Sequence, residues 1–148
     1  MADAPAPLGP GPAITRISTA VGERVLEVRA ASGLSARQLQ VLRLAARGIR
    51  VSTLADRLGT PKSTMTSVLD QLEDAALAVR TTDKDDRRGQ VVTSTAGGMI
   101  ALRNFDRAVD TRLAEVVAGL DETKALRLRE LLAKLPDATL PVPLAGPR

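Results

Sequence analysis

The fold is indicated most clearly by residues 52–75, which read STLADRLGTPKSTMTSVLDQLEDA. A short helix is predicted over Ser52–Leu58, and Gly59 permits the sharp turn that ends it. A second helix is predicted over Thr60–Ala75, because apolar residues recur from 65 to 72 at the three- and four-residue steps of an amphipathic helix. Two helices joined by a short turn that contains glycine are typical of a helix-turn-helix.

Residues that cap helices mark the predicted helix starts. Thr60 is expected to cap the second helix, with Pro61 in its first turn, where the missing N–H costs no hydrogen bond. Ser35 is expected to cap an earlier helix, since Gln38 stands where it completes a capping box. Thr95 and Asp121 are expected to start two more helices nearer the C-terminus.

Beyond Leu77 the pattern changes from helix to strand. Ala78–Thr82 and Gln90–Thr93 are short segments rich in β-branched residues. They flank the charged run DKDDRRG at 83–89, whose glycine aids the return of the chain. The sequence therefore predicts a β-hairpin with a charged tip.

Composition excludes several classes of chemistry. The 148 residues contain no Cys and no His, which removes thiolate nucleophiles, disulfides, the commonest zinc ligands and imidazole bases. We therefore expect no enzyme, no cofactor and no metal site. The net charge of +4 fits a polyanionic partner. With no signal peptide and no apolar run of the ~18 residues that span a bilayer, a cytoplasmic protein without a membrane partner is expected.

The polar face of the second helix is the first candidate site. In a DNA complex the N-terminal part of such a helix enters the major groove. Lys62 and Thr64 suit phosphate oxygens. Base edges are within reach of three hydroxyls, those of Ser63, Thr66 and Ser67, and Asp70 could accept a bond from a cytosine amino group. The alternative reading is a polar face that is only solvated.

The tip of the hairpin is the second candidate site. A long guanidinium from Arg87 or Arg88 could enter a minor groove and sense its width and negative potential. Asp86 could hold an arginine in position by pairing with it. Taken alone, the run is also compatible with a solvated charged turn.

A set of short motifs together carries a family resemblance. They are Leu34-Ser35…Leu42, Leu54-Ala55…Leu58, Ser63-Thr64-Met65-Thr66, Leu72-Glu73, Arg80, Asp86-Arg87-Arg88 and Thr95-x-x-Gly98. Over about residues 34–135 the chain resembles the MarR family of multiple-antibiotic-resistance-type regulators. The most specific part of the resemblance is the spacing from Asp86-Arg87-Arg88 to Thr95-x-x-Gly98.

The resemblance implies a transcription regulator, by default a repressor, that binds double-stranded DNA as an obligate homodimer. It implies a recognition helix at Pro61–Ala75 and a wing at about Ala78–Thr93. It also implies that Arg88 lies in the minor groove and that Asp86 steadies it. In such proteins a small ligand, often phenolic or lipophilic, can sit between the dimer and DNA-binding regions and weaken DNA binding.

The expected fold is mostly α with a small β-hairpin wing: a winged helix-turn-helix domain with N- and C-terminal dimerisation helices. The expected organisation is a disordered tail (1–12), an N-terminal dimerisation helix (13–33), the DNA-binding domain (34–95), C-terminal dimerisation helices (96–135) and a Pro-rich tail (136–148).

The chain departs from the family pattern at five positions. Ala76 stands where the family has glycine and Ser94 where it has leucine, while basic residues are common at the positions of Ser67, Gln71 and Val79. Fewer basic contacts predict weaker or more shape-based recognition of DNA. Without His, Cys, Tyr or Trp, the usual polar groups of a ligand pocket are also missing.

The sequence leaves two alternatives open. Residues 34–48 resemble the opening of LuxR-type helix-turn-helix domains, which lack a wing. The second alternative is a winged-helix module that binds a protein, favoured by the acidic residues Asp70, Glu73 and Asp74.

Overall fold

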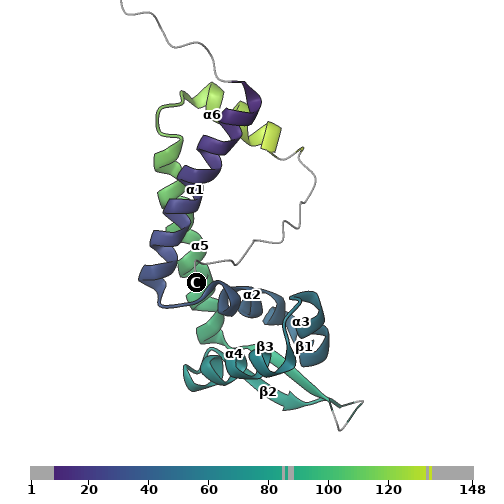
Figure 1. Cartoon of the computed structure of the whole chain (residues 1–148). Helices are drawn as coiled ribbons and strands as arrows, with labels where there is room; N and C mark the ends of the chain where they lie inside the picture. Colours follow the sequence, from purple (N-terminus) through teal and green to yellow (C-terminus); the bar gives the residue numbers. More distant parts are fainter. Residues whose placement is uncertain (1–8, 85, 87–88, 133, 135–148) are drawn as a thin grey trace, which may run out of the picture. The chain divides into compact units, whose positions relative to one another are not determined.

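The computed structural model describes residues 9–84, 86, 89–132 and 134 (Figure 1). It divides into two compact units, the first ending at Leu113 and the second beginning at Ala114. The elements are α1 (Pro10–Ser32), α2 (Ala36–Leu44), the 3-10 helix η1 (Ala45–Arg47), β1 (Ile49–Arg50), α3 (Val51–Arg57), α4 (Lys62–Asp74), β2 (Ala78–Thr82), β3 (Gln90–Ser94), α5 (Ala96–Val116) and α6 (Glu122–Leu132). The predicted fold class, mostly α with a small wing, is confirmed.

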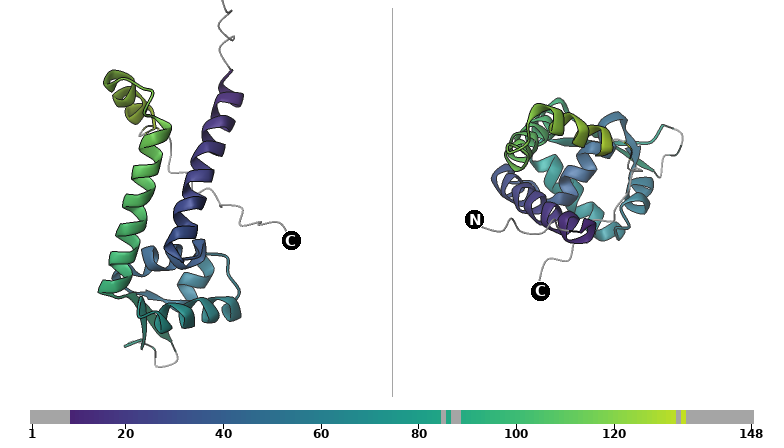
Figure 2. Two further views of the ribbon diagram at one scale, coloured as in Figure 1. Left: turned by 90° about the vertical axis from the view of Figure 1, so that its left-hand side faces the viewer. Right: turned by 90° about the horizontal axis from the view of Figure 1, so that it is seen from above.

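The described strands form a small antiparallel sheet in the order β1-β3-β2. β3 is central because Val92 pairs with Ile49 of β1 on one side and with Arg80 of β2 on the other. The hairpin of β2 and β3 is the predicted wing, and it projects beyond α4 (Figures 1 and 2). The sequence did not reveal β1, because two residues are too few to show a strand pattern.

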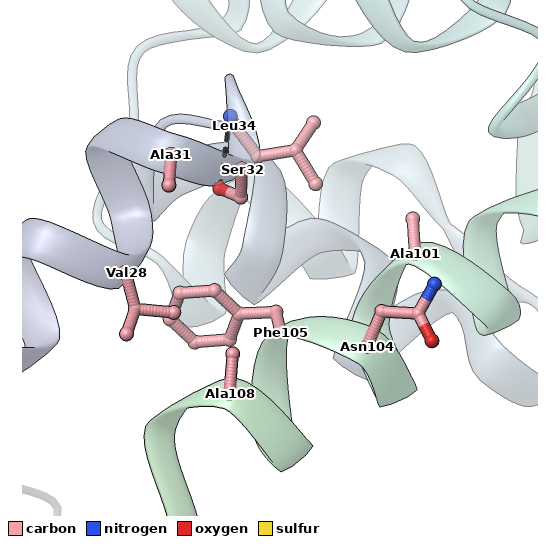
Figure 3. A pocket seen from close by; sticks show the side chains of 8 residues that line it. All are labelled: Val28, Ala31, Ser32, Leu34, Ala101, Asn104, Phe105 and Ala108. Atoms are coloured by element: carbon pink, nitrogen blue, oxygen red, sulfur yellow. Dashed lines mark hydrogen bonds between the residues drawn. The ribbon is translucent and has the colours of Figure 1, made fainter. Parts of the chain in front are cut away.

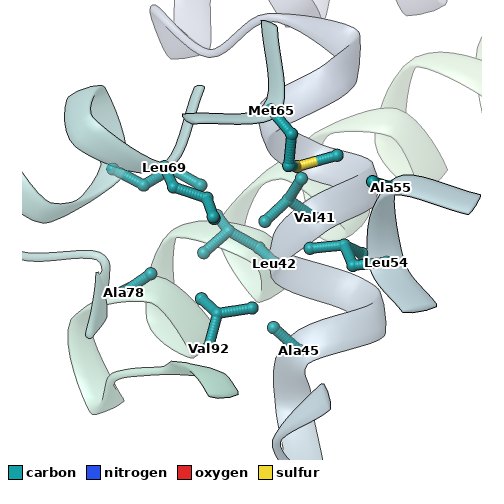
Figure 4. Close-up of a cluster of buried hydrophobic side chains, with 10 residues drawn as sticks. Val41, Leu42, Ala45, Leu54, Ala55, Met65, Leu69, Ala78 and Val92 are labelled. Carbon is teal, nitrogen blue, oxygen red and sulfur yellow. The ribbon is translucent and has the colours of Figure 1, made fainter. Parts of the chain in front are cut away.

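An aliphatic core joins the sheet to α2, α3 and α4, as Figure 4 shows. Its buried residues are Val41, Leu42, Ala45, Leu54, Ala55, Met65, Leu69, Leu72, Ala78 and Val92. The apolar stripes of α3 and α4 both point into this core. The opposite, polar side of α4 is therefore turned outward.

Three predicted caps are confirmed. The Ser35 hydroxyl accepts a hydrogen bond from the Gln38 amide at 3.1 Å, and the Gln38 side chain accepts one from the Ser35 amide at 2.7 Å. Thr95 Oγ1 accepts from the Gly98 amide at 3.0 Å at the start of α5. In the second unit, Asp121 Oδ1 accepts from the Lys124 amide at 2.9 Å at the start of α6.

The predicted start of α4 is wrong. The helix begins at Lys62 with Pro61 at the N-cap and no side-chain cap. Thr60 is buried in the preceding turn, where its amide donates to the Ala55 carbonyl at 2.9 Å and its hydroxyl donates to that of Leu58 at 3.1 Å. The turn thus uses the polar groups of Thr60 that the sequence had assigned to the helix end.

Other helix and strand boundaries also differ from the prediction. α3 covers Val51–Arg57, one residue earlier than expected at each end. α1 begins at Pro10, so residues 10–12, assigned to a tail, are helical. Proline is favourable at the start of a helix, because its φ is already helical and no intrahelical bond needs its N–H. None of the described helices is long and apolar enough to cross a membrane.

Candidate nucleic-acid interface

The turn between α3 and α4 sets the angle between the two helices. Gly59 adopts φ 55°, a left-handed conformation that glycine accepts without a Cβ clash. Its amide donates to the Asp56 carbonyl at 3.1 Å. Arg37 of α2 adds a second constraint, since its guanidinium donates to the Leu58 carbonyl at 2.9 Å. The predicted turn at Gly59 is confirmed.

Five of the predicted site residues share the outward side of α4. Lys62, Ser63, Thr64, Thr66 and Ser67 are exposed, whereas Met65 between them is fully buried. The Thr66 hydroxyl donates to the Lys62 carbonyl at 3.0 Å, which leaves its lone pairs available to a partner. The structure therefore brings a cation and four hydroxyls together near the start of α4.

Asp70, the sixth candidate on α4, is engaged in an ion-pair network. Its Oδ1 accepts a hydrogen bond from Nη2 of Arg80, on β2, at 2.5 Å. Arg80 Nε also donates to Glu73 Oε2 at 2.9 Å, and the Arg80 amide donates to Glu73 Oε1 at 2.6 Å. The role proposed for Asp70 as an acceptor from cytosine thus competes with Arg80.

The network shifts the pKa values of Glu73 and Arg80. Hydrogen bonds from the Arg80 side chain, more than its charge alone, hold the pKa of Glu73 below its ordinary value despite some desolvation. Bonding to Glu73 first, and then to Asp70, raises the pKa of Arg80 above its ordinary value. Both shifts favour the charged forms, so Glu73 and Arg80 stay ionised at neutral pH.

The wing candidates are only partly described. Asp86 is exposed, and its carbonyl accepts from the Gly89 amide at 2.8 Å. Arg87 and Arg88 lie outside the described residues. The pairing of Asp86 with an arginine stays a prediction.

The base of the wing holds an ion pair that the sequence did not indicate. The Asp83 side chain is 5% exposed and lies 2.5 Å from Nε of Arg50, at the junction of β1 and α3. The two residues are far apart in the chain, and charged residues in a polar run give no sign of burial. Only the pairing of β1 with β3 brings them together.

Hydrogen bonds engage some of the positions that depart from the family pattern. The buried Ser94 hydroxyl donates to the Leu42 carbonyl at 2.7 Å, so it holds β3 to α2 by a hydrogen bond. Gln71 accepts from Gln38 Nε2 at 3.1 Å, a second bond between α4 and α2. Val79 is an exposed apolar side chain on β2.

A cavity of about 370 Å³ lies between α1 and α5 (Figure 3). Its lining is Val28, Ala31, Ser32, Leu34, Ala101, Asn104, Phe105 and Ala108. The Ser32 hydroxyl is engaged with the backbone at Arg29 and Leu34, at 2.7 Å and 3.2 Å. The Asn104 amide is therefore the clearest polar group for a ligand, beside the Phe105 ring. Within the described residues no His, Cys, Asp and Glu cluster could hold a metal.

Comparisons with known proteins identify the type of domain. Residues 32–89 match the model of the MarR family. The YusO protein from Bacillus subtilis is 26% identical, with a TM-score of 0.74 over 85% of this chain and 91% of that one. A MarR-family transcriptional regulator from Rhodococcus sp. RHA1 is 27% identical, with a TM-score of 0.60 over 82% and 88%.

A third solved structure includes a small molecule. CouR from Rhodococcus jostii RHA1, bound to p-coumaroyl-CoA, is 26% identical and has a TM-score of 0.58 over 93% of this chain and 94% of that one. The similarity to all three proteins extends well beyond the residues that the family model matches.

Proposed function

The winged-helix domain of this chain is a MarR-family domain, as its sequence pattern predicted, and from this we propose that the chain regulates transcription by binding double-stranded DNA sequence-specifically as a homodimer. Its fold is that of transcription regulators, and we propose no enzymatic activity. The β2–β3 wing counts against the LuxR-type alternative, whose domains lack one.

The observation that carries the proposal is the exposed polar surface at the start of α4. Lys62 and the hydroxyls of Ser63, Thr64, Thr66 and Ser67 are exposed on a helix whose apolar side is buried. No side chain in the described part of the chain caps this helix, so its first amides can meet a phosphate oxygen. In the proposed complex α4 lies in the major groove, with Lys62 and Thr64 on phosphates and Ser63, Thr66 and Ser67 at base edges.

The wing supplies the second proposed contact. A ribbon that projects beyond α4 suits the minor groove next to the bases that α4 reads. From the family resemblance we place Arg88 in that groove, with Arg87 nearby. Asp86 is the proposed partner that steadies Arg88. Recognition of groove width would offset the weak discrimination that short hydroxyls provide.

Exposed apolar side chains support the homodimer. Ile14 and Ile17 on α1 are 64% and 55% exposed in the single chain. In the second unit, Leu126 on α6 is 58% exposed. Burial of such residues against a second copy would remove apolar surface from water and present two recognition helices to two half-sites.

The cavity between α1 and α5 supports control by a small molecule. Its lining is apolar apart from Ser32 and Asn104, and the Phe105 ring offers a stacking surface. The similar CouR structure holds an aromatic acyl thioester. We propose that an aromatic or lipophilic effector binds this cavity and causes the protein to release DNA. We also propose that the protein acts as a repressor.

The deciding experiment is fluorescence-polarisation binding to duplex DNA from the region upstream of the protein's own gene. A scrambled duplex is the reference, and salt is varied. Tighter binding to the upstream duplex at physiological salt would support the proposal. The slope of log binding constant against log salt concentration reports the number of phosphate contacts. A Lys62→Ala variant should reduce the magnitude of this slope by about one. Lys124→Ala, which removes an exposed lysine from α6, should leave the slope unchanged.

Other outcomes point elsewhere. Equal, weak binding to both duplexes would call for a genome-wide selection of binding sites. Failure of that selection as well would overturn the proposed function and favour the module that binds a protein through Asp70, Glu73 and Asp74.

A further inference from the structure

We propose that Arg80 is a positioning residue for DNA recognition, which joins α4 to the wing through Asp70 and Glu73 so that both elements approach DNA as one unit. This inference rests on the proposed function. It assigns Asp70 to the internal network rather than to a base edge.

The geometry ties α4 to the β2 strand of the wing. Arg80 lies on β2 and bonds to two carboxylates of α4, at 2.9 Å to Glu73 and 2.5 Å to Asp70. Glu73 also accepts from the Arg80 backbone amide at 2.6 Å. It therefore holds both the strand and the side chain, which restricts sliding of β2 along α4.

The chemistry favours arginine at this position. Asp70 and Glu73 stand three residues apart on one face of α4, where two negative charges repel each other. A planar guanidinium offers several donors in fixed directions and can satisfy both carboxylates, whereas a lysine ammonium is a point charge on a flexible stem. The Arg80 side chain is only 20% exposed, so water replaces these bonds poorly.

The network also changes the charge that α4 presents. Asp70 is 52% exposed and stands on the same helix as the proposed DNA contacts. Without Arg80, its carboxylate and that of Glu73 would repel DNA phosphates. With Arg80 in place, one of the two negative charges is balanced close to the surface.

The test is a double-mutant cycle in the full-length protein. Arg88→Ala and Arg80→Gln are made singly and together, and affinity for the specific duplex is measured by fluorescence polarisation. If Arg80 positions the wing, Arg88→Ala should cost about tenfold in affinity alone but less than about threefold after Arg80→Gln. Losses that multiply independently would overturn the positioning role.

Two further variants separate charge from geometry. Arg80→Lys keeps the charge but not the planar donor set, so it should stay at least about threefold weaker than wild type; equal affinity overturns the role of the guanidinium. Asp70→Asn should leave the preference at each base pair unchanged across a panel of single-substituted duplexes. A changed preference at one position would make Asp70 a base-reading residue.

A matched control is Arg43→Gln, which removes a different ion pair, that between Arg43 of α2 and Asp106 of α5 at 2.7 Å. It should leave DNA affinity within about twofold. Wild-type protein that binds neither the upstream duplex nor any duplex from the genome-wide selection overturns the proposed function. Specific wild-type binding with an unaffected Arg80→Gln variant overturns only the positioning role of Arg80.

Discussion

The Thr95 hydroxyl donates a hydrogen bond to the Ala76 carbonyl at 2.8 Å, which joins the start of α5 to the end of α4. Ala76 adopts φ 56°, a left-handed conformation. Its amide donates to the Glu73 carbonyl and the Leu77 amide to the Leu72 carbonyl, both at 2.8 Å. This is a Schellman motif, which normally places glycine where Ala76 stands.

Ala76→Gly should therefore stabilise the protein. Relief of the Cβ contact in the left-handed conformation is worth about 1–2 kcal/mol, offset in part by the larger unfolded-state entropy of glycine. We expect a net gain of up to about 1 kcal/mol in the free energy of unfolding in urea. Ala75→Gly is the control: Ala75 has φ −83°, so the same substitution there should destabilise.

Gly98→Ala should destabilise strongly. A Cβ at Gly98 would lie 2.1 Å from the Leu77 carbonyl oxygen and 2.9 Å from Leu42 Cδ2. Backbone must move to admit it, at a cost of roughly 3 kcal/mol or more. At Gly97 the nearest atom is 3.5 Å away, so Gly97→Ala should be neutral or stabilising. Equal melting temperatures for the two variants would contradict this packing.

Stability should fall in acid partly through Glu73. Because its folded-state pKa is lowered by Arg80, its contribution is present above the ordinary titration range of glutamate. That contribution is lost as pH falls through that range toward the lowered pKa. The side chains are partly exposed, so the loss should be about 1 kcal/mol or less. Urea unfolding from neutral to acidic pH would measure this loss. If the free energy of unfolding depends on pH in Glu73→Gln as it does in the wild type, Glu73 is not its source.

Arg88→Ala should weaken DNA binding with little effect on thermal stability. The expectation rests on the family resemblance, which implies that Arg88 lies in the minor groove. Arg103→Ala, which removes an exposed arginine from α5, should change neither quantity appreciably. A large drop in melting temperature for Arg88→Ala would assign this residue a structural role instead.

Ile17→Glu should disrupt the homodimer. Ile17 is an exposed apolar residue on α1, and a buried unpaired carboxylate would oppose association. Light scattering coupled to size exclusion would show a shift to monomer. Thr19→Glu places the same charge on the other side of α1, so the molar mass should remain that of the dimer. A dimeric Ile17→Glu variant would place the interface elsewhere.

Much of the candidate site was predictable because it depends on local pattern. The apolar spacing of α4 was enough to place Ser63, Ser67 and Asp70 on its outward side. Ala76 was singled out only by comparison with the family, and its left-handed backbone explains why glycine is usual there. The partner of Asp70 could not be predicted, because an exposed acid on a helix has the same local pattern whether it faces DNA or an arginine.

The sequence by itself determined the helix starts at Ser35, Thr95 and Asp121, the turn at Gly59 and the two wing strands. These features depend on contacts within about four residues or on alternating side chains, which neighbouring residues specify. Only the tertiary structure decided the contacts between distant segments, such as Arg50 with Asp83 and Ser94 with Leu42. Both pairs form where the core brings separate elements together, since a polar group gains a buried partner only after the apolar side chains around it have packed.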